Sequence, residues 1–301
     1  MKMKNYGFKK FFFKTIKIIV VVLAYVFVYM RLRKYDFASA FASVQNIYFI
    51  LIAFALMPVN WLLEAYKWRE LLSAFVKINI GTSLKAVLCG LPAGIITPAR
   101  VGEWLGRPAC LDGKYRNQGI IATSVGSAVQ QVITIITGLI FLFGFIDSKS
   151  RHSYVLFAVL MLVLIFVFVT ILFLNRDRID RKPFVYFFDY STKNLFAAFC
   201  LGALRYFVFS SQFVLILLAF VPQTGILELY AVVAIMYLLL NILPVANAFD
   251  LGVRSAVSII VAGFFAIDEL KIVFATAIIW IINLVLPTIV GSIMFFRYKK
   301  D

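Results

Sequence analysis

Long apolar segments recur along this chain and restrict it to folds that can place them in a membrane. Six segments have about the 20 residues that cross a bilayer, and we predict each to be a full span. They cover about residues 15–30, 46–68, 118–146, 153–174, 194–221 and 269–296. The chain is 63% hydrophobic and its mean hydropathy is +0.97, whereas soluble domains are roughly 45–50% apolar. We therefore expect an all-α integral membrane protein with a single polytopic domain over residues 1–301.

Two shorter apolar segments, about residues 91–110 and 241–258, break at proline and glycine and then carry charged residues. Such residues persist at hydrocarbon depth mainly where they line a cavity or a pathway. The arm at 82–95 would be about 21 Å long, too short for a hydrocarbon core of about 30 Å. We predict two re-entrant broken-helix hairpins. The second arm, 228–243, is nearly long enough to cross, so a full crossing stays open there.

The basic residues are distributed unevenly along the chain. With the Lys-rich start inside and each hairpin returning to its side of entry, 22 of the 30 Lys and Arg residues fall inside. This asymmetry follows the positive-inside rule and predicts that both termini are cytoplasmic, in the cytoplasmic (inner) membrane of a bacterium. It also explains the net charge of +16 without a nucleic-acid partner.

The order of segments repeats. A span, a broken hairpin and a span occupy residues 46–146, and the same order occupies residues 194–296. The single span at 153–174 between them reverses the direction of the second unit. We therefore predict an inverted-topology repeat, an arrangement typical of transporters whose site lies at the repeat interface.

Each hairpin break can start a helix inside the membrane. Thr97 can cap a helix that has Pro98 at its first position, and Asn247 can cap one that has Asp250 three residues later. The free N–H groups of such helix starts favour an anion. The residues to which we assign the breaks and the close backbone approaches beside them are Thr97, Pro98, Gly102, Pro244, Asn247 and Gly252.

The charged residues of the hairpins have helical spacing. Arg100, Glu103 and Arg107 follow an i, i+3, i+7 pattern on one helix face, and Asp250 and Arg254 form an i, i+4 pair. Each charge at mid-bilayer costs about 2.5–3.5 kcal/mol, which argues for a ligand. A purely structural role, in which the charges pair with one another, stays open.

Two further charged residues lie deep in predicted spans. Glu64 is expected to pair with Arg100 or Arg107. Arg205 either contacts a lipid phosphate or pairs with an acid such as Glu64. An interfacial anchor belt is the expected role of four neighbours of Glu64, namely Trp61, Lys67, Trp68 and Arg69.

The chain resembles the lysylphosphatidylglycerol synthase transmembrane-region family over most of its length. The stretches that carry the resemblance are Asn60-Trp61 through Glu64 to Lys67-Trp68, Thr97-Pro98-Ala99-Arg100-Val101-Gly102-Glu103, Gly106-Arg107, and Leu251-Gly252-Val253-Arg254. The resemblance implies a flippase-like bundle with two re-entrant hairpins. It does not imply synthase activity, because the soluble aminoacyltransferase domain of the namesake is absent from residues 1–301. Asp250 stands where we expect Glu in relatives.

The sequence therefore predicts a translocator that moves an anionic or aminoacylated phospholipid, or another lipid-linked substrate, between leaflets. Arg100, Arg107 and Arg254 are expected to meet the anionic headgroup. Three carboxylates, Glu64, Glu103 and Asp250, would balance these charges or bind a headgroup amine. We expect Arg100→Ala and Arg254→Ala each to impair movement while leaving insertion intact.

Two alternatives remain. One is a non-catalytic membrane partner of an enzyme that modifies lipids or polyprenyl-linked glycans, and association as a homodimer is also open. The other is an intramembrane enzyme, which the absence of a nucleophile with a base and of a metal-ligand spacing argues against. No P-loop pattern is present, so the sequence predicts no ATP-driven step, no cofactor and no metal.

Overall fold

The structure, a computed structural model, describes residues 25–33, 44–97, 101–145, 190–242 and 250–298, and its regular secondary structure in these ranges is helical, with no strand among them. The helices, in chain order, are α3 (Ile47–Ala55), α4 (Met57–Leu72), α5 (Ile80–Ile96), α6 (Val101–Gly106), η1 (Pro108–Cys110), η2 (Gly113–Tyr115), α7 (Arg116–Gly144), α10 (Thr192–Phe220), α11 (Ile226–Ile242), α12 (Asp250–Phe264), α13 (Glu269–Trp280), η7 (Ile281–Val285) and α14 (Leu286–Tyr298). The predicted all-α class is confirmed for this part of the chain.

Four helical segments are long and apolar enough to cross a membrane: Ile47–Leu72, Gly113–Gly144, Thr192–Phe220 and Glu269–Met294. They coincide with four of the six predicted spans. The predicted span at 153–174 and most of the one at 15–30 lie outside the described residues, so the full count of six stays a prediction.

The surface of the bundle is apolar, as a lipid-facing surface requires. Large hydrophobic side chains such as Phe196, Phe207 and Ile140 are more than half exposed, while charged residues such as Glu64 and Lys67 are buried. In soluble proteins, by contrast, Lys and Glu are mostly exposed and are almost never fully buried unless paired. The fold therefore places its apolar side chains outward and its ionisable groups in the interior.

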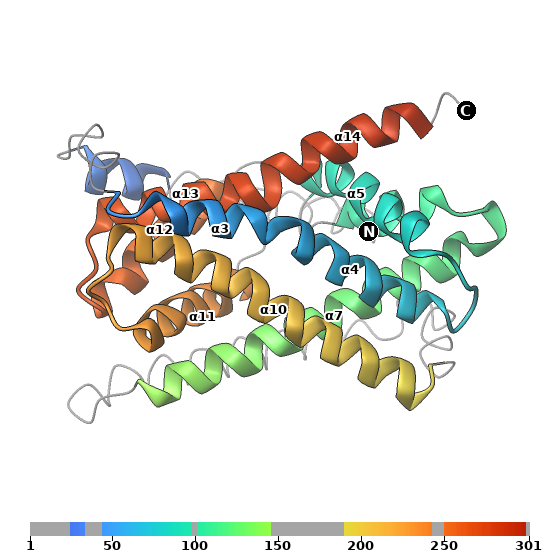
Figure 1. The fold of residues 1–301 in the computed structure, drawn as a ribbon, viewed down its shortest axis with the longest axis horizontal. Helices are drawn as coiled ribbons and strands as arrows, with labels where there is room; N and C mark the ends of the chain where they lie inside the picture. The colour runs from blue at the N-terminus through green and yellow to red at the C-terminus, as the bar shows by residue number, and fades with distance from the viewer. Residues whose placement is uncertain (1–24, 34–43, 98–100, 146–189, 243–249, 299–301) are drawn as a thin grey trace, which may run out of the picture.

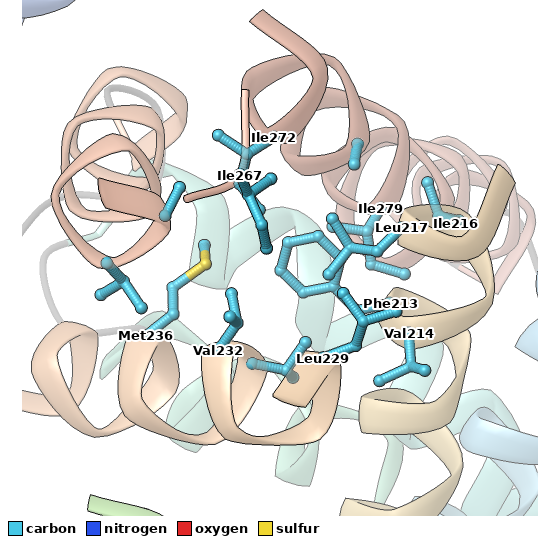
Figure 2. Packing of buried hydrophobic residues seen from close by; sticks show 14 of the residues in the cluster. Phe213, Val214, Ile216, Leu217, Leu229, Val232, Met236, Ile267, Ile272 and Ile279 are labelled. Carbon is cyan, nitrogen blue, oxygen red and sulfur yellow. The ribbon is translucent and has the colours of Figure 1, made fainter. Parts of the chain in front are cut away.

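One hydrophobic core holds α10, α11 and α13 together. Figure 2 shows Phe213 of α10 between residues of the neighbouring helices, with Met236 of α11 and Ile279 of α13 close by. Phe213 is fully buried, and Met236 is 1% exposed. This packing fixes the relative positions of three helices that also form one side of the candidate site.

The two predicted hairpins lie toward opposite ends of the long axis of the molecule. In Figure 1, α5 is at the right-hand end, whereas α11 and α12 are at the left-hand end. The first arms, α5 and α11, have 17 residues each, or about 25 Å of helix, less than a hydrocarbon core of about 30 Å. Both lengths are compatible with re-entrant arms. The turns of both hairpins, with Pro98, Arg100, Pro244 and Asn247, lie outside the described residues.

Thr97 joins the two arms of the first hairpin. Its hydroxyl donates to the Ala93 carbonyl oxygen (3.0 Å) and accepts from the backbone N–H of Gly102 (2.6 Å). Thr97 is thus the C-cap of α5, and the described part of the next helix begins at Val101. A Cβ on Gly102 would lie 2.0 Å from the Ala93 carbonyl oxygen, so only glycine permits this close return of the chain. Gly252 is similarly crowded, by the ring of Tyr25.

The helix after each hairpin packs on the first arm of the other hairpin. Helix α14 packs on α5, and α7 packs on α11. Gly291 of α14 faces the Leu88 carbonyl oxygen of α5, where a Cβ would come within 2.0 Å. Pro92 has no N–H to donate to that carbonyl, which explains why the carbonyl is available to a neighbouring helix. On the other side, Gly138 of α7 faces Leu238 of α11, where a Cβ would come within 2.6 Å.

We expect Gly291→Ala to destabilise the protein by about 1–3 kcal/mol, because the added methyl group forces α14 away from α5. Gly263→Ala is the matched control, since a Cβ at Gly263 in α12 meets nothing within 4 Å. The free energy of unfolding in mixed detergent micelles is the measurement. Equal stability of the two variants would contradict the close approach at Gly291.

A charged cavity between the two hairpins

A cavity of about 360 Å³ lies between the hairpins and is lined by residues of α4, α5, α6, α7, α10, α11, α12, α13 and η7. Its volume falls within the range of about 300–1,000 Å³ typical of ligand sites. Seven charged side chains line it: Glu64, Lys67, Glu103, Arg107, Arg205, Asp250 and Arg254. Among the described residues this makes four cations and three carboxylates, a net charge of +1.

Glu64 is the centre of the charged cluster. Its carboxylate lies 2.7 Å from Lys67 Nζ, 2.7 Å from Arg107 Nη1 and 3.3 Å from Arg205 Nε. Lys67 lies one helical turn further along α4, whereas the two arginines come from the first hairpin and from α10. One carboxylate therefore ties three separate parts of the chain together.

Arg107 is shared between two carboxylates. Its Nη1 binds Glu64 and its Nη2 binds Glu103 Oε2 at 2.8 Å. All three side chains are less than 10% exposed. The Glu103–Arg107 spacing of four residues brings the pair to one helix face, as the sequence predicted. The predicted pairing of Glu64 with Arg107 is also confirmed.

The second hairpin contributes the pair Asp250–Arg254, one turn apart in α12. Asp250 accepts a hydrogen bond from Arg254 Nε, as the spacing of this i, i+4 pair predicted. The Arg254 side chain is 28% exposed, and that of Arg205 is 21% exposed. Tyr237 of α11 lines the cavity together with both arginines.

The structure thus brings six of the seven predicted substrate-binding residues to one cavity, and the seventh, Arg100, lies outside the described residues. The six come from distant parts of the chain: Glu64, Glu103, Arg107, Arg205, Asp250 and Arg254. Their proximity is a tertiary property, because residues such as Glu64 and Arg254 lie far apart along the sequence.

The predicted anchor belt is wrong for Lys67 and Trp68, both of which are 1% exposed. Lys67 pairs with Glu64 and donates to Gln130 at 3.4 Å, and Trp68 Nε1 donates to Thr123 Oγ1 at 2.9 Å. A headgroup-level anchor must reach the bilayer surface, and these side chains point into the bundle. Trp61 lines the cavity, and Arg69 lies over the ring of Tyr66.

Sequence reasoning missed the uncharged polar residues of the cavity wall. Gln130 of α7 accepts a hydrogen bond from Arg205 Nη1 at 3.1 Å. Asn60 of α4 and Asn283 of η7 also line the cavity and bond to each other at 3.4 Å. Amide side chains inside predicted spans are a usable signal, since polar groups at membrane depth are rare and face the interior.

The described residues contain no group of three or more His, Cys, Asp or Glu side chains that could hold a metal ion. Comparisons of this chain with protein-family models, with curated proteins and with solved structures find no match. The described residues form a helical bundle that has four helices long and apolar enough to cross a membrane and a charged cavity in its interior.

We expect Glu64→Gln to lower the free energy of unfolding by about 3–5 kcal/mol, because it leaves two buried cations, Lys67 and Arg107, and the partly buried Arg205 without their common partner. Glu228→Gln, which changes an exposed acid of α11, is the matched control and is expected to have little effect. The measurement is denaturant titration in mixed micelles.

A double variant tests the electrostatic cause. Arg205→Gln in the Glu64→Gln background removes one of the uncompensated cations, so it is expected to recover part of the lost stability. Additive destabilisation in the double variant would show that the loss comes from packing and not from charge.

Proposed function

We propose that this protein is a lipid translocator that moves a phospholipid or other lipid-linked substrate with an anionic headgroup between membrane leaflets. The observation that carries the proposal is that both hairpins place charged residues in one cavity with a net charge of +1. The headgroup enters this cavity while the acyl chains stay in the bilayer. We place the protein in the bacterial cytoplasmic membrane with both termini inside.

The charge of the cavity supports an anionic group as the ligand. Lys67 and Arg107 are nearly fully buried against carboxylates, whereas Arg205 and Arg254 keep about a quarter of their side-chain surface accessible. Arginine binds phosphate through several donors in a fixed planar arrangement. A phosphodiester between Arg205 and Arg254 would neutralise the net charge of the cavity.

The arrangement of the helices supports movement between leaflets. The hairpins lie toward opposite ends of the molecule, and each packs against the long helix that follows the other one (Figure 1). An inverted repeat has this reciprocal packing, and transporters with such repeats bind substrate at the repeat interface. Residues of both hairpins line the cavity, which is where such a repeat would hold its substrate.

The distribution of polarity supports a lipid-like substrate. Keeping seven ionisable groups inside an apolar bundle is costly, and such groups usually mark a substrate or ion pathway. The exposed surface around them is rich in Phe, Leu and Ile. A molecule with a polar headgroup and apolar tails can satisfy both environments at once.

Vesicles that contain the purified protein and trace phosphatidylglycerol with a fluorophore on its acyl chain test the proposal. A membrane-impermeant quencher reports how fast inner-leaflet lipid becomes accessible. We expect the protein to accelerate this exchange and Arg254→Gln to slow it about tenfold or more, since a hydrogen bond to a charged group contributes about 1.5–3 kcal/mol.

Arg116→Gln is the matched control, because Arg116 is an exposed cation at the start of α7 and outside the cavity lining. Equal slowing by both variants would attribute the effect to overall charge and would contradict an anion site at Arg254. Folded protein that accelerates neither this lipid nor an aminoacylated one would favour the alternative of a non-catalytic partner subunit of a lipid-modifying enzyme.

A further inference from the structure

One wall of the cavity is uncharged and is built on an irregular helical turn. The segment η7, Ile281–Val285, is a π-helix inserted between α13 and α14. Single π-turns are rare in proteins overall, but those that occur often lie at functional sites. Asn283 lies in this turn and lines the cavity. The turn thus presents an amide side chain to the cavity in the middle of an otherwise apolar span.

Asn283, which is partly buried, belongs to a chain of three amides with a fixed direction, and the other two, Asn60 and Gln212, are buried. Asn60 Nδ2 donates to Asn283 Oδ1 (3.4 Å), and Asn283 Nδ2 donates to Gln212 Oε1 (3.1 Å). Gln212 Nε2 then donates to the backbone carbonyl of Ala53 (2.8 Å). A carbonyl oxygen only accepts, so it fixes the orientation of Gln212 and, in turn, of both asparagines.

This direction leaves one acceptor unused at the first of the three amides, Asn60. Asn60 must turn its Nδ2 toward Asn283, so its Oδ1 points elsewhere, and that oxygen has no hydrogen-bond partner in the described part of the protein. Asn60 is 5% exposed and lines the cavity. A buried polar atom without a partner is costly and requires an explanation.

A donor without a partner belongs to the lining of the same cavity. Trp280, three residues before Asn283, also lines the cavity, and its buried Nε1–H has no acceptor within the described ranges. Trp280 and Asn283 both belong to the lining of this cavity. The wall therefore offers one neutral acceptor and one neutral donor.

We infer that this wall is a second subsite, which binds a hydroxyl group of the substrate headgroup beside the charged subsite at Arg205 and Arg254. A hydroxyl donates and accepts at once, so it can bond to both Asn60 Oδ1 and Trp280 Nε1–H. An ammonium group only donates, and a carboxylate only accepts. The substrate class is then a phosphodiester lipid whose headgroup carries a hydroxyl, such as a polyol or a sugar.

This inference rests on the proposed translocator function, and two lipid probes separate the two ideas. Phosphatidylglycerol and phosphatidylpropanol have the same charge and the same three-carbon headgroup, but only the first carries hydroxyls. Both are given an acyl-chain fluorophore, so their headgroups stay unmodified. We expect the exchange of phosphatidylglycerol to be about two- to tenfold faster, the effect of one typical hydrogen bond.

Trp280→Phe removes the indole N–H and keeps an aromatic ring, and it breaks no hydrogen bond that the described structure shows. We expect the ratio of the two exchange rates to fall toward one in this variant. Trp68→Phe is the matched control. It also removes an indole N–H, one that is bonded to Thr123 outside the cavity lining, and it is expected to keep the wild-type ratio.

A binding measurement completes the test. Short-chain forms of both lipids are added to the protein in detergent, and the increase in Tm reports their binding. A larger increase with phosphatidylglycerol that Trp280→Phe abolishes supports the subsite, even if neither lipid is moved and the translocator proposal fails. Equal increases and equal exchange rates for the two lipids would overturn the subsite and leave the translocator proposal intact.

Discussion

The carboxylate of Glu64 is the interaction on which the arrangement of the bundle depends. A single buried carboxylate contacts Lys67 of the same helix, Arg107 of the first hairpin and Arg205 of α10. Any one of these cations would be strongly destabilising at this depth without a partner. The first hairpin packs apolar residues of α5 against α4, and the Arg107–Glu64 pair adds a charged contact between the same two elements beside the cavity.

The outer surface and the interior of the bundle have opposite requirements, and different residues meet each of them. Its outer surface must be apolar, and residues such as Phe196 and Phe207 provide this. Its interior must compensate polar groups, and it does so with carboxylate–cation pairs on one side and a directional chain of amides through Gln212 and Asn283 on the other. The hydrophobic core around Phe213 holds the helices that carry both systems (Figure 2).

The two subsites that we propose divide the recognition of a headgroup between charge and hydrogen bonding. The arginines of α10 and α12 attract any phosphodiester, which gives binding without much selectivity. The neutral wall at Asn60 and Trp280 then favours headgroups that supply a hydroxyl, because other headgroups leave a buried donor or acceptor unpaired, and such mismatches give the largest discrimination. Helices from both hairpin units contribute to the cavity, so a relative movement of the units would alter both subsites together.

The sequence by itself determined the class of fold, four of the helical spans, and the local charge pairs. Hydrophobic length and helical spacing are local properties, so the segment Thr192–Phe220 and the pairs Glu103–Arg107 and Asp250–Arg254 could be predicted from neighbouring residues alone. Only the tertiary structure decided which distant groups meet. The burial of Lys67 and the chain of amides through Asn283 depend on which faces of separate helices pack together. Many packings satisfy the same apolar periodicity, so no spacing along the chain encodes that choice.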